Sequence, residues 1–229
     1  MAAIIVAAGR SQRMAGGDKL WASLAGPDGR QRPLLAYSVA AFERCAAIER
    51  IALVLTDDTL ARGHDLVRDE GFAKVCAVVP GGARRQDSVR AGLAALGGGA
   101  WVAIHDGARP LVTPELIERG LAAAQSTGAA CCALPVPDTV KEAAEGVILR
   151  TLERSRLWLA QTPQLFRYDL LVRAHNESHG DATDDASMVE ALGVRVKLFE
   201  GSSRNIKVTT QDDLALVQAL LLGGRSGDL

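Results

Sequence analysis

Short hydrophobic runs alternate along this chain with longer segments in which apolar residues recur at helical spacing. Runs of this kind, almost free of polar residues, are typical of strands that are buried on both faces of a sheet. Five of them are predicted strands: residues 3–7, 51–55, 75–79, 101–104 and 129–134. Segments 33–44, 60–70 and 85–96 are predicted helices, the first of them opening with Pro33. Strands that alternate with helices predict an α/β fold, with a mostly parallel sheet in a three-layer arrangement.

The regular alternation stops after residue 134. Residues 135–154 carry two prolines and a Glu145-Gly146 turn signal between short β-prone runs, which predicts a protruding hairpin. An arm that cannot bury its own apolar face packs against something else, so residues at about 135–157 are predicted to form a homodimer contact.

The last third of the chain returns to regular elements. A short strand is expected at 161–166, a helix at 168–178, and an acidic helix start with Thr183 as its cap or as a ligand contact. A final strand at 194–200 and a helix from Thr210 to about residue 222 follow, and the tail 223–229 is expected to be disordered. No repeat or linker divides the chain, so residues 1–229 are expected to be one domain with an arm.

Composition and charge exclude several classes of function. The net charge of −1 gives no electrostatic footprint for nucleic acid or an anionic membrane. No apolar run approaches the roughly 18 to 20 residues that cross a bilayer, and no cationic segment precedes the first strand, so we expect a cytoplasmic protein. Cys45, Cys76, Cys131 and Cys132 lie in apolar segments, and we interpret them as buried small hydrophobes rather than disulfide or zinc residues.

The first predicted strand leads into a loop that is rich in glycine and cations, AAGRSQRMAGGDK at residues 7–19. Gly9 allows a close approach of backbone N–H groups to an anion, while Arg13 and Lys19 supply positive charge for a polyphosphate. Ligands of open α/β sheets bind at this edge, so the loop predicts a nucleotide phosphate site. Neither a dinucleotide fingerprint nor a Walker loop is present. For this loop alone, a simple solvated turn remains an equal alternative.

Two further loops follow predicted strands. Pro80, Gly81 and Gly82 form a tight turn before a helix that carries Ser88 near its start, where backbone donors and a hydroxyl can meet an anion or a base. Asp106 follows the fourth strand and is a candidate ligand for Mg²⁺, which takes one or two carboxylates plus phosphate oxygens. Arg109 could hold a phosphate with two hydrogen bonds. Plain turn chemistry is the alternative interpretation of both loops.

Taken together, these loops resemble the 2-C-methyl-D-erythritol 4-phosphate cytidylyltransferase family. The resemblance rests on an ordered set of motifs: AAGRSQRM…K at 7–19, GG..RQDSV at 81–89, HDGARP at 105–110, DT at 138–139, ER..LW at 153–158, QTPQLF at 161–166, TDDAS at 183–187 and NIKVT at 205–209. It implies a homodimer with a Rossmann-like nucleotidyltransferase sheet. The implied reaction transfers CMP from the co-substrate CTP to methylerythritol phosphate and releases pyrophosphate, with Mg²⁺ or another divalent cation.

The resemblance also implies roles for particular residues. Nucleotide binding would fall to Ala7, Ala8, Gly9, Gly82 and Ser88. Arg13, Lys19 and Lys207 would be catalytic cations, with Asp106 near the metal and the acceptor. Contacts to the acceptor would come from Asp106, Arg109, Thr183 and Lys207, and from Thr139 and Arg154 on the arm of the partner subunit. The chain departs from the family pattern at Ala83 and Arg84, where relatives often carry acidic residues.

The sequence leaves three alternatives open. A cytidylyltransferase for another polyol phosphate, such as ribitol 5-phosphate, would have nearly the same nucleotide loops. A catalytically silent nucleotide-binding protein is disfavoured by the cations and carboxylate at the strand ends. An NAD-dependent dehydrogenase has the same fold class but would need the missing fingerprint.

Overall fold

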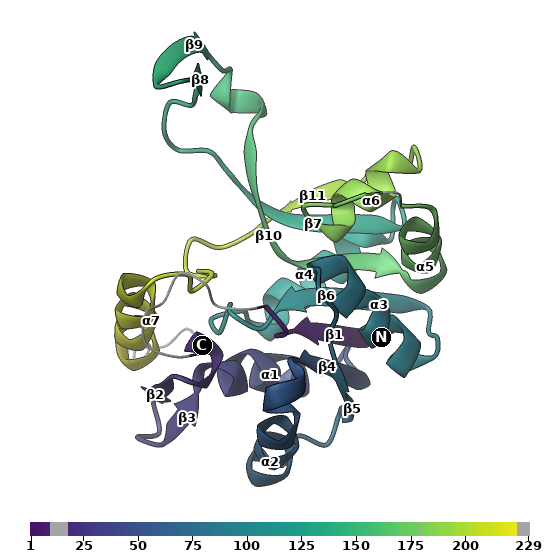
Figure 1. Cartoon of the computed structure of the whole chain (residues 1–229), viewed down its shortest axis with the longest axis vertical. Coiled ribbons are helices and arrows are strands. Elements are labelled where there is room, and N and C mark those ends of the chain that lie inside the picture. Colours follow the sequence, from purple (N-terminus) through teal and green to yellow (C-terminus); the bar gives the residue numbers. More distant parts are fainter. Residues whose placement is uncertain (10–17, 179, 224–229) are drawn as a thin grey trace.

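The computed structural model describes residues 1–9, 18–178 and 180–223. A seven-stranded sheet forms its centre, in the order β11-β7-β10-β6-β1-β4-β5 (Figure 1). The strands are β1 (Ala2–Val6), β4 (Arg50–Leu55), β5 (Val75–Pro80), β6 (Trp101–Asp106), β7 (Ala129–Pro135), β10 (Trp158–Arg167) and β11 (Lys197–Glu200). All neighbouring pairs are parallel except the two that involve β10. The predicted mostly parallel α/β sheet is therefore confirmed.

Helices cover both faces of the sheet. One face packs against α1 (Leu34–Arg44), α2 (Leu60–Glu70), α4 (Pro114–Ala124) and α7 (Gln211–Gly223), and the other against α3 (Arg85–Leu96), α5 (Tyr168–Glu177) and α6 (Asp185–Ala191). Strand β1 shows why its sequence is continuously apolar: Ala3 and Ile5 enter the first core, whereas Ala2 and Ile4 enter the second. Successive strand residues point to opposite faces, so a strand covered on both sides has no position for a polar side chain.

Helix α3 lies unusually close to the sheet. A Cβ atom on Gly92 would lie 2.5 Å from Cγ2 of Ile4, which only a glycine avoids. This close approach sets the position of the whole helix relative to β1, and hence of its first residues at the carboxyl edge of the sheet.

Strand β10 runs against its neighbours because of the arm. The chain leaves the sheet at the end of β7 and forms β8 (Lys141–Ala144), β9 (Val147–Thr151) and the short helix η3 (Arg154–Arg156). It then returns along β10, which inserts between β7 and β6, and a hairpin return of this kind is antiparallel. The strand predicted at 161–166 is thereby extended to ten residues.

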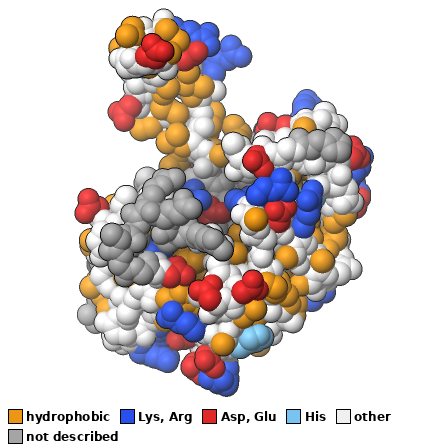
Figure 2. Space-filling view, in the orientation of Figure 1, with side chains coloured by type: hydrophobic (Ala, Val, Ile, Leu, Met, Phe, Trp, Pro, Cys, Tyr) orange, Lys and Arg blue, Asp and Glu red, His pale blue; other side chains and the backbone are white. Residues whose placement is uncertain are grey.

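The arm projects away from the sheet and its sides carry apolar side chains (Figures 1 and 2). Val147, Ile148 and Leu149 are each exposed by 60% or more, and Trp158 and Leu159 are also exposed. The predicted hairpin is confirmed.

Several predicted boundaries were wrong. An unpredicted ribbon, β2 (Ser23–Ala25) with β3 (Gln31–Pro33), precedes α1, so Pro33 ends a strand and the helix begins at Leu34. The strand predicted at 194–200 begins only at Lys197, where it meets β7. The cap of α6 is Asp184, whose side chain accepts from the Ser187 amide, and not Thr183. A carboxylate one residue later in the same motif satisfies the helix end instead.

The cysteine prediction holds at three of four positions. All four cysteines are free, and Cys45, Cys131 and Cys132 are buried, but Cys76 is exposed. Cys76 belongs to β5, which is an edge strand and is covered less completely than the central strands. The predicted disordered tail falls mostly at 224–229, outside the described residues. Within the described ranges, none of the helices is both long enough and apolar enough to span a membrane.

Candidate active site

Asp106 is the last residue of β6 and stands at the carboxyl edge of the sheet. It lies in register with Val6, the last residue of β1, so the ends of the two strands meet. Its backbone N–H donates to Oγ1 of Thr162 at 3.1 Å, and the residue is only 8% exposed. A carboxylate is thus held by a rigid strand at the edge where α/β sheets bind their ligands.

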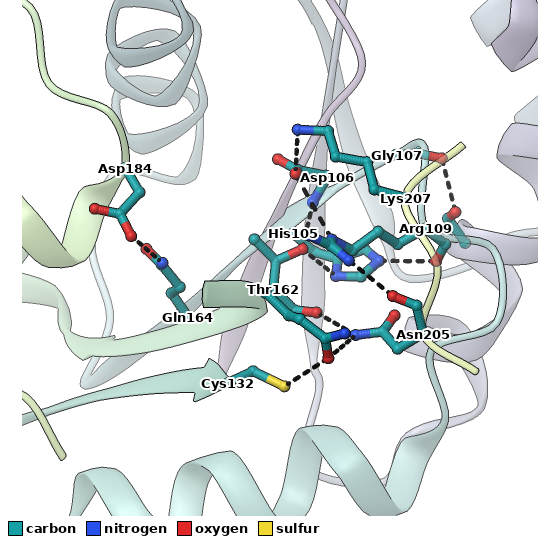
Figure 3. Close-up of polar contacts among 12 residues, drawn as sticks. His105, Asp106, Gly107, Arg109, Cys132, Thr162, Gln164, Asp184, Asn205 and Lys207 are labelled. Atoms are coloured by element: carbon teal, nitrogen blue, oxygen red, sulfur yellow. Dashed lines mark hydrogen bonds and ion pairs between the residues drawn. The ribbon is translucent and has the colours of Figure 1, made fainter. Parts of the chain in front are cut away.

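The segment before α7 brings Lys207 onto this carboxylate. The amide of Val208 donates to the carbonyl of Ala108 at 2.9 Å, and the Asn205 side chain donates to the Thr162 carbonyl at 2.7 Å. These bonds dock the segment beside the loop after β6. Nζ of Lys207 consequently lies 2.8 Å from Oδ2 of Asp106 (Figure 3).

Three cations surround Asp106. Besides Lys207, Nε of Arg85 lies 3.3 Å from Oδ1, and Nε of Arg109 lies 3.8 Å from Oδ2. Burial by itself would raise the pKa of Asp106, but the charges of Arg85, Lys207 and Arg109 outweigh it and hold the pKa well below its usual range. The carboxylate stays ionised, and the cluster has a surplus of positive charge suited to a phosphate.

Arg109 is more deeply buried than an arginine whose guanidinium is free to bind a phosphate. Only 8% of the residue is exposed, and its NH1 donates to the carbonyl of Asn205 at 2.7 Å. Burial lowers the pKa of this guanidinium, an effect that the charge of Asp106 opposes. In the structure Arg109 therefore holds the Asn205 segment by a hydrogen bond. Its contact with the acceptor stays a prediction.

His105 has a hydrogen-bonding role at the end of β6. Its Nε2 lies 3.1 Å from the Arg109 carbonyl and its Nδ1 lies 3.1 Å from Oγ1 of Thr162 (Figure 3). Burial lowers the pKa of His105 to about 4, against the smaller opposing effect of Asp106. The neutral ring of His105 holds the loop after β6 and Thr162 in place. This structural role accounts for a histidine here without a catalytic function.

The predicted nucleotide-binding residues come together beside this cluster. A Cβ atom on Gly81 would lie 2.3 Å from Cβ of Ala8 and 2.6 Å from Oγ of Ser88. One on Gly107 would lie 3.1 Å from Cβ of Ala7. Ala7 and Ala8, at the start of the first loop, therefore pack directly against the loops after β5 and β6. Such close packing requires glycine at Gly81.

Ser88 closes the second of these loops. Its Oγ accepts from the amide of Gly82 at 3.2 Å and donates to the carbonyl of Arg84 at 3.3 Å. Arg84 itself is paired with Asp87 at 2.8 Å and with Asp181 at 3.1 Å. The positive charge that departs from the family pattern is thus neutralised within the protein.

The remaining predicted residues lie in several places. Gly9 is exposed at the end of the first described segment, and Lys19 is half-buried at the start of the short helix η1 (Lys19–Trp21). Arg13 lies outside the described residues. Thr183 is exposed in the bend before α6. The roles predicted for these residues therefore remain predictions.

The two residues predicted to act from the arm lie in the segments that join the β8–β9 ribbon to the sheet, Thr139 before β8 and Arg154 in η3 after β9. Arg154 donates from NH1 to the Pro137 carbonyl at 2.7 Å, and Pro137 is close in sequence to Thr139. Both Arg154 and Thr139 are exposed. The arm itself points away from the sheet of its own subunit (Figure 1).

Sequence reasoning assigned no role to several residues that build the site. Thr162 and Asn205 hold the Lys207 segment, and the half-buried Arg85 connects Asp106 to the buried Asp185 and His175. All but His175 lie within the motifs quoted above, so the motifs marked their importance. Only the tertiary contacts show what each of these residues does in the site.

Asp106 could provide one of several ligands to a divalent cation. Within residues 1–9, 18–178 and 180–223, no group of three or more His, Cys, Asp or Glu side chains is placed to hold a metal. Mg²⁺ commonly takes only one or two carboxylates and completes its shell with phosphate oxygens and water. The ionised, slightly exposed carboxylate of Asp106 is compatible with this coordination preference.

A separate cleft lies at the opposite edge of the sheet. It has a volume of about 630 Å³ and is lined by Trp101, Thr127, Gly128, Arg167 and Arg173, among others. These residues lie near the start of β6 and β7 and the end of the antiparallel β10. The cleft is therefore distinct from the cluster around Asp106.

Glycine-rich loops packed beside a buried carboxylate and a surplus of cations are suited to binding a triphosphate and directing attack at its phosphorus. With this sheet, they define a nucleotidyltransferase. The family model described as IspD, 2-C-methyl-D-erythritol 4-phosphate cytidylyltransferase, matches residues 1–222. The chain belongs to this enzyme family.

Relatives and solved structures agree over nearly the whole chain. A 2-C-methyl-D-erythritol 4-phosphate cytidylyltransferase of Dehalococcoides mccartyi (strain CBDB1) is 46% identical over 224 residues, which cover 97% of this chain and 96% of the relative. One of Syntrophotalea carbinolica is 46% identical over 226 residues, covering 95% and 94%. The crystal structure of the enzyme of that name from Thermus thermophilus matches with a TM-score of 0.77 and 35% identity, covering 96% of this chain and 98% of that one.

Proposed function

We propose that this chain transfers CMP from CTP to 2-C-methyl-D-erythritol 4-phosphate, giving 4-diphosphocytidyl-2-C-methyl-D-erythritol and pyrophosphate. Membership of the family over residues 1–222 supports the reaction. The observation in this structure that carries the proposal is the Asp106–Lys207 pair at 2.8 Å, beside loops suited to a nucleotide. The product would serve isoprenoid precursor synthesis by the non-mevalonate pathway.

The acceptor phosphate is the nucleophile in this proposal. Its second pKa is about 6, so at neutral pH it is mostly dianionic and needs no base from the enzyme. An oxygen of the acceptor phosphate forms a bond to the α-phosphorus of CTP while the bond from that phosphorus to pyrophosphate breaks. Two anions must approach each other, so catalysis consists of positioning and charge stabilisation.

Cations of this chain supply that stabilisation. An ammonium group has three donors, so Lys207 can hold Asp106 and also meet a phosphate oxygen. Lys207 and Arg109 would bind the acceptor phosphate with Thr183, while Arg13 and Lys19 would neutralise the α-phosphate. Ala7, Ala8, Gly9, Gly82 and Ser88 would bind the nucleotide.

We infer that Asp106 also provides one oxygen ligand to Mg²⁺ or another divalent cation. Such an ion neutralises the charge of the triphosphate when it is bound. The low pKa of Asp106 supports this role, because the carboxylate is ionised whenever the substrates are.

We further infer a homodimer in which the arm, at about residues 135–157 of the single domain 1–229, contacts the partner subunit. The exposed Val147, Ile148 and Leu149 support this inference, since a two-stranded ribbon is not stable by itself. Thr139 and Arg154 would then reach the acceptor site of the partner. A cytoplasmic location completes the proposal.

The direct test is pyrophosphate release from CTP and methylerythritol phosphate, with and without Mg²⁺. Ribitol 5-phosphate replaces the acceptor in one control, and ATP, GTP or UTP replaces CTP in others. We expect Mg²⁺-dependent turnover only with CTP and methylerythritol phosphate. Turnover with ribitol 5-phosphate alone would refute the acceptor assignment, and CTP binding without any turnover would refute the reaction.

A further inference from the structure

A chain of polar contacts runs from the interior of the protein to Lys207. It starts at His175 of α5, passes Asp185 of α6 and Arg85 of α3, and ends on Asp106 and Lys207. The contacts are His175 Nε2 to Asp185 Oδ1 at 3.1 Å, Arg85 NH1 to Asp185 Oδ2 at 2.6 Å, Arg85 Nε to Asp106 Oδ1 at 3.3 Å, and Lys207 Nζ to Asp106 Oδ2 at 2.8 Å. Its first three members have no role in the proposed reaction.

Asp185 is the centre of this chain. Its side chain has no exposed surface, and each carboxylate oxygen has a partner, one in His175 and one in Arg85. The next residues of its helix, Ala186, Met188 and Val189, are buried in an apolar cluster. A buried ion pair is often no more stabilising than apolar residues of the same volume, so fold stability alone does not explain a carboxylate here.

Asp185 determines how Arg85 meets Asp106. A guanidinium that faced Asp106 with two nitrogens would occupy both carboxylate oxygens, as arginine commonly does. Here NH1 is held by Asp185, and Nε of Arg85 contacts only Oδ1 of Asp106. The other oxygen, Oδ2, contacts Lys207 (Figure 3).

The electrostatics of Arg85 agree with this geometry. Burial by itself would lower the pKa of the guanidinium, but the charge of Asp185, and after it that of Asp106, raises the pKa above its ordinary value. Arg85 therefore stays charged between the two carboxylates.

We propose that Asp185, oriented by His175, is a positioning residue: it holds Arg85 on Oδ1 of Asp106 and so leaves Oδ2 to Lys207. This inference rests on the proposed function, in which Lys207 meets the acceptor phosphate. Loss of Asp185 would free Arg85 to cover Asp106 and displace Lys207, which would weaken the acceptor site more than the nucleotide site.

The test compares Asp185→Asn, Arg85→Gln and the double variant by steady-state kinetics, with each substrate varied in turn. Asp169→Asn is the matched control, because Asp169 is an exposed carboxylate paired with Arg167 at the opposite edge of the sheet. For Asp185→Asn we expect a rise of about tenfold in the KM for methylerythritol phosphate, the size of one lost charged hydrogen bond, with the KM for CTP within about twofold. The double variant should be no worse than Arg85→Gln, because both act through one contact.

Three results of the variant comparison would overturn the proposal. Asp185→Asn could behave like Asp169→Asn, both KM values could rise together with a loss of thermal stability, or the two single effects could simply add. A crystal structure of Asp185→Asn gives a readout independent of activity: Lys207 should leave Oδ2 of Asp106, and an unchanged contact refutes the inference. If Asp185→Asn does not fold, His175→Leu removes the hydrogen bond that orients Asp185 and should raise the KM for methylerythritol phosphate in the same direction.

Failure of the proposed function has a different signature. The unmodified chain would then not turn over CTP and methylerythritol phosphate. The crystal structure of Asp185→Asn would still decide whether Asp185 positions Lys207.

Discussion

Lys207 and Asp106 lie far apart in the sequence, yet Nζ of the first is 2.8 Å from Oδ2 of the second. The pair joins the end of a central strand to a segment that is docked by tertiary contacts, among them the hydrogen bond from Val208 to Ala108 and the burial of Val208 in the core. Because Lys207 is already paired with Asp106, it can contact a phosphate without leaving an unpaired charge in the ligand-free protein.

Lys207→Ala should lower kcat/KM by about two to three orders of magnitude, the cost of removing one charge-stabilising donor from an active site. The fold should persist, because Asp106 keeps Arg85 and Arg109 as partners. Steady-state kinetics and thermal unfolding of the same variant measure both effects. Lys197→Ala, an exposed lysine on the edge strand β11, is the control and should be unchanged.

Lys19→Ala should lower kcat far more than it raises the KM for CTP, because a cation at the α-phosphate gains most of its interaction as charge develops in the transition state. Lys19→Arg keeps the charge and should retain part of the activity. An unchanged kcat in Lys19→Ala would remove this residue from the catalytic set.

Gly81→Ala should impair nucleotide binding through packing alone. The added methyl group would lie 2.3 Å from Cβ of Ala8, which forces the first loop away from α3. Overpacking of this kind costs about 1–3 kcal/mol, so the KM for CTP should rise by about tenfold or more. Gly223→Ala serves as the control, since no atom lies within 4 Å of its added methyl group. Equal KM values for the two variants would contradict the packing argument.

The arm gives a prediction about mixed subunits. Arg154→Ala and Lys19→Ala should each be nearly inactive, but a mixture of the two chains should regain activity if arms cross between subunits. Each hybrid dimer then contains one site with both an intact Lys19 and an intact Arg154. The assay is pyrophosphate release after refolding the chains together, with each variant refolded alone as the control. No recovery in verified mixed dimers would show that the arm serves its own subunit.

Asp213 makes the stability of the Lys207 segment depend on pH. Its Oδ2 accepts from the Thr209 and Thr210 amides and from the Thr209 hydroxyl, each at 2.8 Å. Burial alone would raise the pKa of Asp213, but these bonds lower it from 3.8 to about 2. Because the folded value lies below the unfolded one, the stabilisation is complete above the unfolded pKa and is lost as pH falls through the folded pKa.

Asp213→Asn should therefore lower the free energy of unfolding by about 1–2 kcal/mol at neutral pH, as for other helix caps. The difference from the unmodified protein should shrink as the pH falls below 3.8 toward about 2. Urea unfolding at several pH values measures it, with the exposed neighbour Asp212→Asn as the control. A difference that stayed constant with pH would exclude the ionised carboxylate as its source.

The parallel core was predictable because its information is local. Strand β1 is continuously apolar since both of its faces are buried, and the predicted helices at 60–70 and 85–96 match α2 and α3 in the structure. Helix α4 likewise begins with local signals, a Thr113 cap followed by Pro114. Where one segment carries the whole signal, the sequence is sufficient.

Elements that depend on distant partners were missed or misplaced. The direction of β10 follows from the arm that precedes it, and the start of β11 follows from where it meets β7. Cys76 has an apolar sequence context, and only the edge position of β5 makes it exposed. No local pattern contains these facts, because they concern which strands become neighbours.

The sequence by itself determined the fold class, the family, and the residue types at each strand end, since these depend on local patterning and on motifs in order. Tertiary structure decided which of those residues act together. The three cations around Asp106 come from different elements: Arg85 from a helix, Arg109 from a loop and Lys207 from a distant segment. The buried contact of Asp185 with Arg85 is of the same kind. Electrostatic interactions depend on distance in space and on burial, and neither quantity exists until the chain has folded.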